Sequence, residues 1–419
     1  MIQYKKYKDS GISWIGKIPE HWEVTCIKRI ANVYTGTTPS TNVKKYFNSK
    51  DINWYTPADF SEENLYLDKS NRFLSQTLLD EKIIRLYPAK CVLLIGIGGT
   101  LGKIGYSNKE CYSNQQINAI IFNNKLNSLY YAYSLQPIKP YIWANANTAT
   151  MPILNQSATK NIFVAIPSVE EQQQIADYLD WKCAEVDRIV GVREKQIILL
   201  KELRSSVISR AVTRGLDPNV PLKDSGIDWI GQIPKHWETG AYKRCMKINN
   251  GKDYKNIVEL DGFPVIGSGG QFSYASNFMY DGEVVFLGRK GTIDKPIYFN
   301  GKFWAVDTMF YSVPNKRSFC KFMYYQAMMF PFDKYSTSTA LPSMTQNDLG
   351  NNHISIPFLS EQQQIANYLD EKTAEIDNTI EKYKMQINKL KEYRQALITE
   401  VVTGKIDVRD VKIPINQNE

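Results

Sequence analysis

Apolar residues recur at spacings of three, four and seven along two long stretches of the chain, and this spacing predicts two amphipathic helices. Residues 170–214 contain no proline, so the first helix extends for roughly 65 Å at 1.5 Å per residue. We interpret the apolar stripes as surfaces for helix pairing and partner docking. The first helix spans 168–215, with its stripe at Ile175, Leu179, Val186, Val190, Ile197, Leu200 and Val207. The second spans 358–405, with its stripe at Ile365, Leu369, Ile376, Ile380, Ile387, Leu390 and Leu397.

Charges are ordered along both helices and favour antiparallel pairing. Residues 170–187 hold six acids and one base, whereas 188–214 hold two acids and seven bases. The counts are six to one over 361–381 and two to six over 382–405. Acids first and bases last suit each helix dipole, and antiparallel packing also sets each acidic half against a basic half.

The predicted helix ends carry stop and start signals. Ser168 and Ser360 follow an Ile-Pro pair and can cap the two N-termini. Gly215 and Gly404 provide the matching stops.

Shorter apolar and aromatic runs between Gly, Asn and Pro clusters fill the rest of the chain and predict strands with short helices between them. The fold class is therefore α+β. Expected strands are 92–95, 119–122, 284–287 and 309–313, and expected short helices are 129–135 and 319–329. Polar loops lie between them at 54–60, 114–116, 145–150 and 335–339.

The chain repeats itself. Lys8–Glu23 returns as Lys223–Glu238 with 13 of 16 positions identical, and the Glu-Gln-Gln-Gln-Ile-Ala block at Glu171 returns at Glu361. Between these blocks the two copies diverge strongly, with Gly96, Gly99, Thr100 and Lys103 aligned to Gly288, Gly291, Thr292 and Lys295. The pattern indicates two variable globular units in a common frame, with an internal pseudo-two-fold repeat.

Composition narrows the functional classes. The 419 residues carry a net charge of +8, of which +8 lies in 1–169 and +2 in 216–360, so the globular units hold the excess and suggest a polyanionic partner. Six cysteines without a Cys-x-x-Cys pair and only three histidines argue against disulfide frameworks, zinc sites and most His-based catalysis. Neither a membrane span nor a secretory signal is present, so we expect a cytoplasmic protein.

The sequence contains none of the catalytic motifs that we searched for. The glycine-rich stretch Gly96–Lys103 does not have Walker spacing, and no Asn-Pro-Pro tetrad, Gly-x-Ser-x-Gly elbow or clustered carboxylates occur. We therefore predict no catalytic residues and no metal site. A glycine-bearing hairpin turn is the better interpretation, with nearby cations as phosphate contacts and neighbouring loops as base contacts. The candidate DNA-binding residues are Tyr55, Thr56, Lys103, Asn114, Gln115, Gln116, Arg289, Lys290 and Lys295.

His21 and His236 recur inside the Pro-x-His-Trp blocks. A catalytic role is conceivable, but no partner acid or nucleophile recurs with them in the sequence. We favour a packed turn that fixes each unit to the helices.

Two divergent units, each opened by Gly-Ile-x-Trp-Ile-Gly-x-Ile-Pro-x-His-Trp and closed by Ile-Pro and Glu-Gln-Gln-Gln-Ile-Ala, closely resemble the DNA specificity subunit of type I restriction-modification systems. The resemblance covers nearly the whole chain. It implies two globular α/β target recognition domains separated by two long antiparallel helices that form a coiled coil. Each domain would read one half of a bipartite, asymmetric double-stranded DNA site, and the helices would set the spacing.

The resemblance further implies partners and cofactors. The helices would dock two methyltransferase subunits, and restriction subunits could join. S-adenosylmethionine, ATP and Mg would be bound by partners only. The implied domains are 1–167 and 216–357 for target recognition, 168–215 and 358–405 for the spacer helices, and 406–419 for a tail. One departure is Gly191, where the second helix has Glu381.

Two other functions are weighed against this one. An enzyme with a concealed nuclease or hydrolase site would need matched carboxylates converging in a pocket. A pure protein scaffold would never touch DNA.

Overall fold

The computed structural model describes residues 2–81, 83–145, 153–332 and 343–414. The chain forms two compact units. Unit 1 comprises Met1–Glu194 and Lys384–Glu419, and unit 2 comprises Lys195–Tyr383. Each unit therefore contains half of each long helix. Within the described ranges, no helix combines the length and apolar character that crossing a membrane requires.

Unit 1 is built on a four-stranded antiparallel sheet in the order β4-β10-β7-β8. A smaller sheet, β6-β5-β9, lies beside it, with β5 parallel to β9. The elements are β1 (Tyr7–Asp9), β2 (Lys17–Pro19), β3 (Glu23–Cys26), β4 (Ala31–Thr35), β5 (Ile52–Tyr55), β6 (Phe73–Leu74), α1 (Thr77–Asp80), β7 (Cys91–Ile95), β8 (Ile104–Ser107), β9 (Cys111–Ser113), β10 (Ile117–Phe122), α2 (Ser128–Leu135), α3 (Lys139–Asn145), α4 (Gln156–Lys160) and β11 (Phe163–Ile166).

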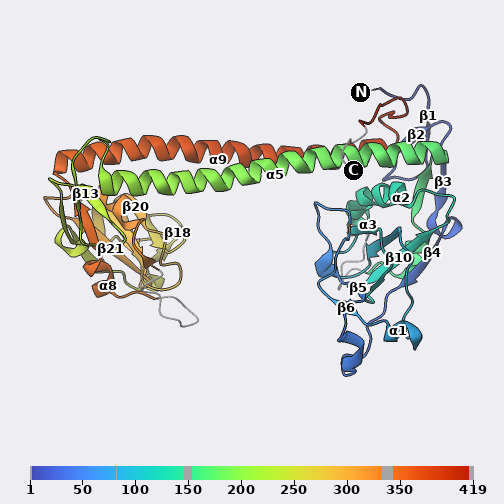
Figure 1. The fold of residues 1–419 in the computed structure, drawn as a ribbon, viewed down its shortest axis with the longest axis horizontal. Coiled ribbons are helices and arrows are strands. Elements are labelled where there is room, and N and C mark those ends of the chain that lie inside the picture. Colours follow the sequence, from blue (N-terminus) through green and yellow to red (C-terminus); the bar gives the residue numbers. More distant parts are fainter. Residues whose placement is uncertain (1, 82, 146–152, 333–342, 415–419) are drawn as a thin grey trace. The chain divides into compact units, whose positions relative to one another are not determined.

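The core of unit 1 lies between this sheet, α2 and the long helices (Figure 1). Strand β7 is buried along its whole length, which is why its sequence is a continuous apolar run. Tyr130, Tyr131 and Tyr133 of α2 are buried against α5 (Val169–Arg214). The C-terminal residues Ile406 and Val408 complete the same core.

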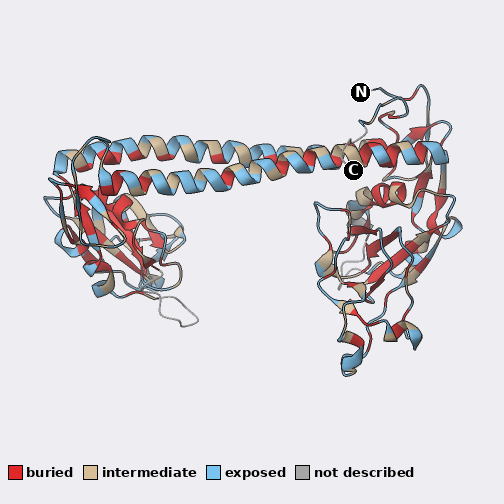
Figure 2. Cartoon of the chain, in the orientation of Figure 1, coloured by how far each residue is buried: buried red, intermediate tan, exposed pale blue. Residues whose placement is uncertain are grey.

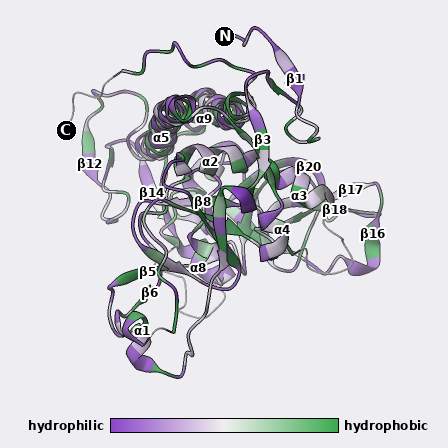
Figure 3. Ribbon diagram, turned by 90° about the vertical axis from the view of Figure 1, so that its right-hand side faces the viewer, coloured by the Kyte–Doolittle hydropathy of each residue, from purple (hydrophilic) through white to green (hydrophobic). Residues whose placement is uncertain are grey.

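Unit 2 has a single seven-stranded sheet in the order β15-β21-β19-β20-β17-β18-β16. Strands β16, β17 and β18 lie together at one margin of the unit (Figure 3). The elements are β12 (Leu222–Asp224), β13 (Gln232–Pro234), β14 (Glu238–Ala241), β15 (Met246–Asn250), β16 (Val258–Glu259), β17 (Phe263–Gly267), β18 (Gly270–Ala275), β19 (Tyr280–Gly288), β20 (Ile297–Ala305), β21 (Met309–Pro314), α6 (Cys320–Ala327), α8 (Gln346–Asn351) and β22 (His353–Ile356).

The expected strands and short helices are confirmed in both units. Four expected strands lie within β7, β10, β19 and β21, and the two expected short helices correspond to α2 and α6. Helix α6 packs on the sheet of unit 2 much as α2 does in unit 1, with Phe322 and Met323 fully buried.

The long helices α5 and α9 (Leu359–Val402) pair antiparallel within each unit. In unit 1, Asp187 of α5 lies 3.4 Å from Arg394 of α9. In unit 2, the Nε of Arg204 donates to both carboxylate oxygens of Asp377, at 3.0 and 3.2 Å. These two ion pairs occupy matching positions of the repeat, so the antiparallel arrangement expected from the charge order is confirmed. Buried and exposed positions alternate in stripes along both helices (Figure 2).

Three of the four expected helix-end signals are correct. The Ser168 hydroxyl accepts a hydrogen bond from the Glu171 N–H at 3.2 Å, and Gly215 and Gly404 end their helices with φ of +74° and +71°. Ser360 is not a cap. Helix α9 begins at Leu359, so Ser360 already lies in its first turn, and the backbone carbonyl of Phe358 accepts from the first turn instead.

Candidate nucleic-acid interface

Four segments meet at one end of the main sheet in unit 1 and are joined by backbone hydrogen bonds. Residues 36–38 follow β4, 56–60 follow β5, 96–100 follow β7, and 113–116 join β9 to β10. The Thr37 N–H donates to the Ser113 carbonyl at 2.9 Å, the Asn114 N–H to Tyr55 at 3.0 Å, and the Gly96 N–H to Gln116 at 2.7 Å. We call this set the loop edge of unit 1.

The same construction recurs in unit 2 with different side chains. Its loop edge consists of 251–253, 267–272, 289–292 and 305–308, which follow or join β15, β17, β19 and β20. The Lys252 N–H donates to Ala305 at 2.8 Å, the Val306 N–H to Ile266 at 3.2 Å, and the Arg289 N–H to Thr308 at 2.9 Å. Backbone geometry is therefore repeated where sequence is not.

This equivalence corrects the sequence alignment of the glycine turns by one residue. Ile95 pairs with Ile117 in unit 1, whereas Gly288 pairs with Met309 in unit 2. Gly288 thus corresponds to Ile95, not to Gly96. The turn glycines with positive φ, Gly98 and Gly291, follow the corrected alignment.

The structure gathers most of the predicted DNA-binding residues at these edges. Asn114, Gln115 and Gln116 form one segment of the unit 1 edge, and Gln115 is exposed. The Asn114 side chain is buried and donates to the Gln116 side chain at 2.9 Å, so it supports the loop. Thr56 closes a capping box with Asp59, to which its hydroxyl donates at 2.9 Å.

Two of the predicted residues are corrected. Tyr55 is fully buried, and its hydroxyl donates to the Leu67 carbonyl, so the ring belongs to the core. Lys103 has an ammonium group within 3.3 Å of Glu62, and only 15% of its side chain is exposed. Burial and pairing leave neither side chain available to a nucleic acid in this fold.

In unit 2 the predicted cations are exposed. Arg289 and Lys290 lie on the loop edge, and Arg289 is oriented by a 3.2 Å hydrogen bond from its Nη1 to the Asp307 carbonyl. Lys295 is exposed just beyond the turn. The sequence prediction missed Lys252, an exposed cation on the same edge, because no motif precedes it.

The positive charge of the first copy lies elsewhere than expected. The exposed side chains of the unit 1 edge, Thr37, Thr38 and Gln115, are neutral. Cations instead surround the small sheet, where Lys50 and Arg72 stack on the rings of Phe73 and Trp54. Of the polar loops predicted from sequence, 146–150 and 335–339 lie outside the described residues.

The histidines of the repeated block hold the units to their helices. His21 lies 3.0 Å from the Glu171 carboxylate, and His236 lies 3.0 Å from that of Glu361. A partner acid therefore does recur, which the sequence interpretation missed because the acid lies in the other repeated block. Tyr4 in unit 1 and Trp237 in unit 2 donate to the same carboxylates, so each pair is part of a packed junction.

Both copies of the repeat match one protein family. Residues 19–186 and 234–391 match the family described as the type I restriction modification DNA specificity domain. The chain belongs to this family. It is a DNA specificity subunit.

Relatives of this specificity subunit include two from Methanocaldococcus jannaschii. The type I restriction enzyme MjaVIII specificity subunit is 24% identical over 430 residues, covering 94% of this chain and 95% of the relative. The MjaIX specificity subunit is 27% identical over 260 residues, or 60% of this chain and 58% of its own length.

Solved structures share the fold. A chain from a structure described as the structural basis underlying complex assembly and conformational transition of the type I R-M system has a TM-score of 0.72 at 14% identity, covering 93% of this chain and 99% of its own. The HsdS subunit from Thermoanaerobacter tengcongensis has a TM-score of 0.52 at 14% identity, with 93% and 98% covered.

The predicted helix stripe of this specificity subunit is mainly internal. The buried residues of this stripe contact the other helix or the core of their unit, so they offer no surface to a second protein. This corrects the expectation that these residues dock a partner. Buried residues are Ile175, Leu179, Val186, Ile197, Ile365, Leu369 and Ile387. Leu200, Ile376 and Leu390 are half-buried.

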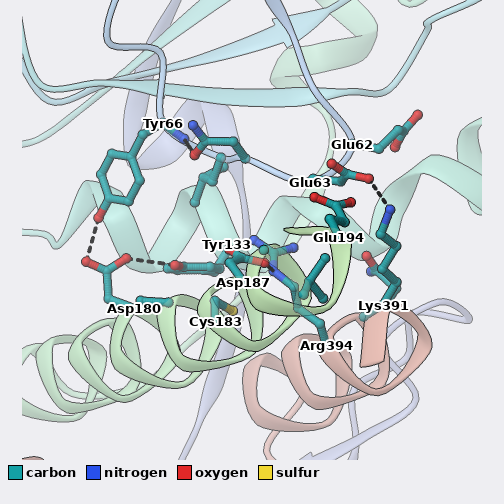
Figure 4. Close-up of a pocket in the computed structure, with 16 residues that line it drawn as sticks. Glu62, Glu63, Tyr66, Tyr133, Asp180, Cys183, Asp187, Glu194, Lys391 and Arg394 are labelled. Carbon is teal, nitrogen blue, oxygen red and sulfur yellow. Dashed lines mark hydrogen bonds and ion pairs between the residues drawn. The ribbon is translucent and has the colours of Figure 1, made fainter. Parts of the chain in front are cut away.

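A cavity of about 690 Å³ opens in unit 1 between residues 62–66 and the two helices (Figure 4). Gly191 lies in its wall, where the second copy has Glu381. Asp180 accepts hydrogen bonds from the Tyr66 and Tyr133 hydroxyls at 2.6 and 2.7 Å. Burial raises the pKa of the Cys183 thiol to about 11, so that thiol is protonated and unreactive at neutral pH.

Proposed function

We propose that this specificity subunit reads a bipartite DNA site, one half with each loop edge, and carries out no catalysis itself. The observation that supports this most directly is the loop edge, whose backbone hydrogen bonds are the same in both units while its side chains differ. A fixed frame with exchangeable side chains suits a reader whose target varies.

The chemistry of the two edges supports an asymmetric site. Unit 1 offers hydroxyl and amide groups, such as Thr37 and Gln115, which hydrogen-bond to base edges. Unit 2 offers Lys252, Arg289 and Lys290, which suit phosphates and guanine and outnumber the exposed acids Asp253 and Asp307 of the same edge. Two half-sites of different sequence are therefore expected.

The partners in this proposal are double-stranded DNA, two methyltransferase subunits and restriction subunits. The methyltransferase subunits dock on the exposed faces of the long helices, because the apolar stripe predicted from the sequence is mainly buried. In unit 2, α5 exposes Leu199 and Leu203, with 62% and 49% of their surface accessible. S-adenosylmethionine, ATP and Mg are bound by these partners.

The test is co-expression with the methyltransferase subunit, followed by sequencing of DNA to locate methylated adenines. We expect a split motif, no methylation by the chain alone, and loss of methylation with Arg289→Ala/Lys290→Ala while assembly is retained. The matched control is Lys223→Ala, which removes an exposed lysine of β12 outside the loop edge. Methylation or cleavage by the purified chain alone would contradict the proposal, as would an unaffected double variant.

A further inference from the structure

Unit 2 carries an exposed aromatic surface at its loop edge that unit 1 lacks. Residues 267–272 run from the last residue of β17 through the turn into β18, and they begin at the place where 56–60 begin in unit 1, because β17 and β5 lie parallel to matching strands. In unit 1 this segment ends in Phe60, which is buried. In unit 2 the chain continues into β18, where Phe272 has 55% of its surface accessible.

Tyr254 and Gly267 contact the Phe272 ring. Tyr254 packs edge-on against it, with ring centroids 5.2 Å apart at 88°. Its other support is Gly267, where an added Cβ would lie 3.0 Å from the ring. The ring therefore lies over the hairpin with an exposed surface and does not project as a wedge.

The loop edge that carries this ring also carries cations and hydrogen-bond donors. Gly267 adjoins Val306, whose N–H donates to the Ile266 carbonyl. The backbone carbonyl of the next residue, Asp307, accepts a hydrogen bond from the Arg289 guanidinium at 3.2 Å. The loop edge of unit 2 thus combines a partly exposed apolar ring with groups that suit phosphates and base edges.

We propose that Phe272 contacts the 5-methyl group of a thymine in the half-site read by unit 2, and so distinguishes thymine from cytosine at that position. The inference rests on the proposed function and adds the chemistry of one base contact. Apolar side chains recognise the thymine methyl in the major groove, and a supported ring surface suits a methyl group better than intercalation.

The test uses deoxyuridine, which lacks only the methyl group. The specificity subunit is assembled with its methyltransferase subunits, and each thymine of the mapped half-sites is replaced in turn. We expect one position in the unit 2 half-site where replacement weakens binding about three- to five-fold for the native chain. The Phe272→Ala complex should bind thymine and uracil equally there.

The matched control is Phe278→Ala, an exposed phenylalanine between β18 and β19 that packs against Phe263, at the opposite end of β17. It should retain the native sensitivity to uracil. A unit 2 half-site without thymine, or a Phe272→Ala complex that still discriminates uracil, would overturn the inference. In either case specific binding to a split site would persist, whereas failure of the proposed function would remove it.

Discussion

At the scale of single residues, the loop edges depend on close backbone approach. A Cβ at Gly36 would overlap the carbonyl oxygen of Asn114, and one at Gly251 would overlap that of Val306. Both glycines donate their N–H across the edge, to Ile117 and Met309. The same residue type serves the same contact in both copies, although the residues around it differ.

We expect Gly36→Ala to destabilise unit 1 by about 1–3 kcal/mol, since the added methyl group must displace backbone. Recognition of one half-site should weaken and the other should be unchanged. Gly99→Ala is the control, because nothing would lie within 4 Å of a Cβ added at that position. Urea unfolding and half-site competition measure both effects, and equal stability of the two variants would refute the expectation.

Sequence alone predicted which polar residues lie on the loop edges better than it predicted their surroundings. Gln115 and Arg289 are exposed on the edges, as expected from a polar loop for Gln115 and from the glycine-bearing turn for Arg289. Tyr55 could not be separated from them, because a strand-end tyrosine has the same local pattern whether its hydroxyl faces solvent or, as here, the Leu67 carbonyl. The recurring acids Glu171 and Glu361 were missed because each lies more than a hundred residues from its histidine.

At the scale of elements, the two matching helix ion pairs differ in their surroundings. Arg204 makes two hydrogen bonds to Asp377, whereas Arg394 lies 3.4 Å from Asp187 beside the cavity that Gly191 helps to line. The periodic sequence pattern predicted both helices and their direction. It could not predict this cavity, which depends on residues 62–66 from another part of unit 1.

Gly191→Ala should stabilise unit 1 by about 0.5–1 kcal/mol, because alanine has the higher helix propensity and no atom lies within 4 Å of the added Cβ. Chemical unfolding of the whole chain, followed by a probe in unit 1, measures the change. The comparison is Gly404→Ala, which also lies in unit 1 and should destabilise because φ is +71° at that position. A loss of stability with Gly191→Ala would show that the helix requires glycine there.

At the scale of the whole molecule, duplication supplies two independent frames. Each unit has its own sheet, its own buried core and its own junction of histidine, glutamate and helix end. Apart from close-approach glycines such as Gly36 and Gly251, the interiors are free to differ, because the bonds that set each loop edge join backbone groups. This separation explains why sequence similarity is confined to the ends of each copy.

The difference in charge between the two loop edges leads to a prediction about salt. Binding that neutralises phosphates weakens with salt, with a slope near −0.9 per contact in a plot of log affinity against log salt. Replacing Lys252, Arg289 and Lys290 with glutamine in the assembled methyltransferase complex should therefore reduce the steepness of that slope, by at most about 2.7 if each cation meets one phosphate.

Changes at the neutral edge of unit 1, such as Thr37→Ala with Gln115→Ala, should lower discrimination against altered half-sites and leave the slope unchanged. Fluorescence anisotropy across a series of KCl concentrations measures both complexes on the same DNA. If the unit 1 variant reduced the slope as much as the unit 2 variant, the two edges would contact DNA by the same electrostatic means. The chemical difference between them would then have no part in setting the asymmetry of the site.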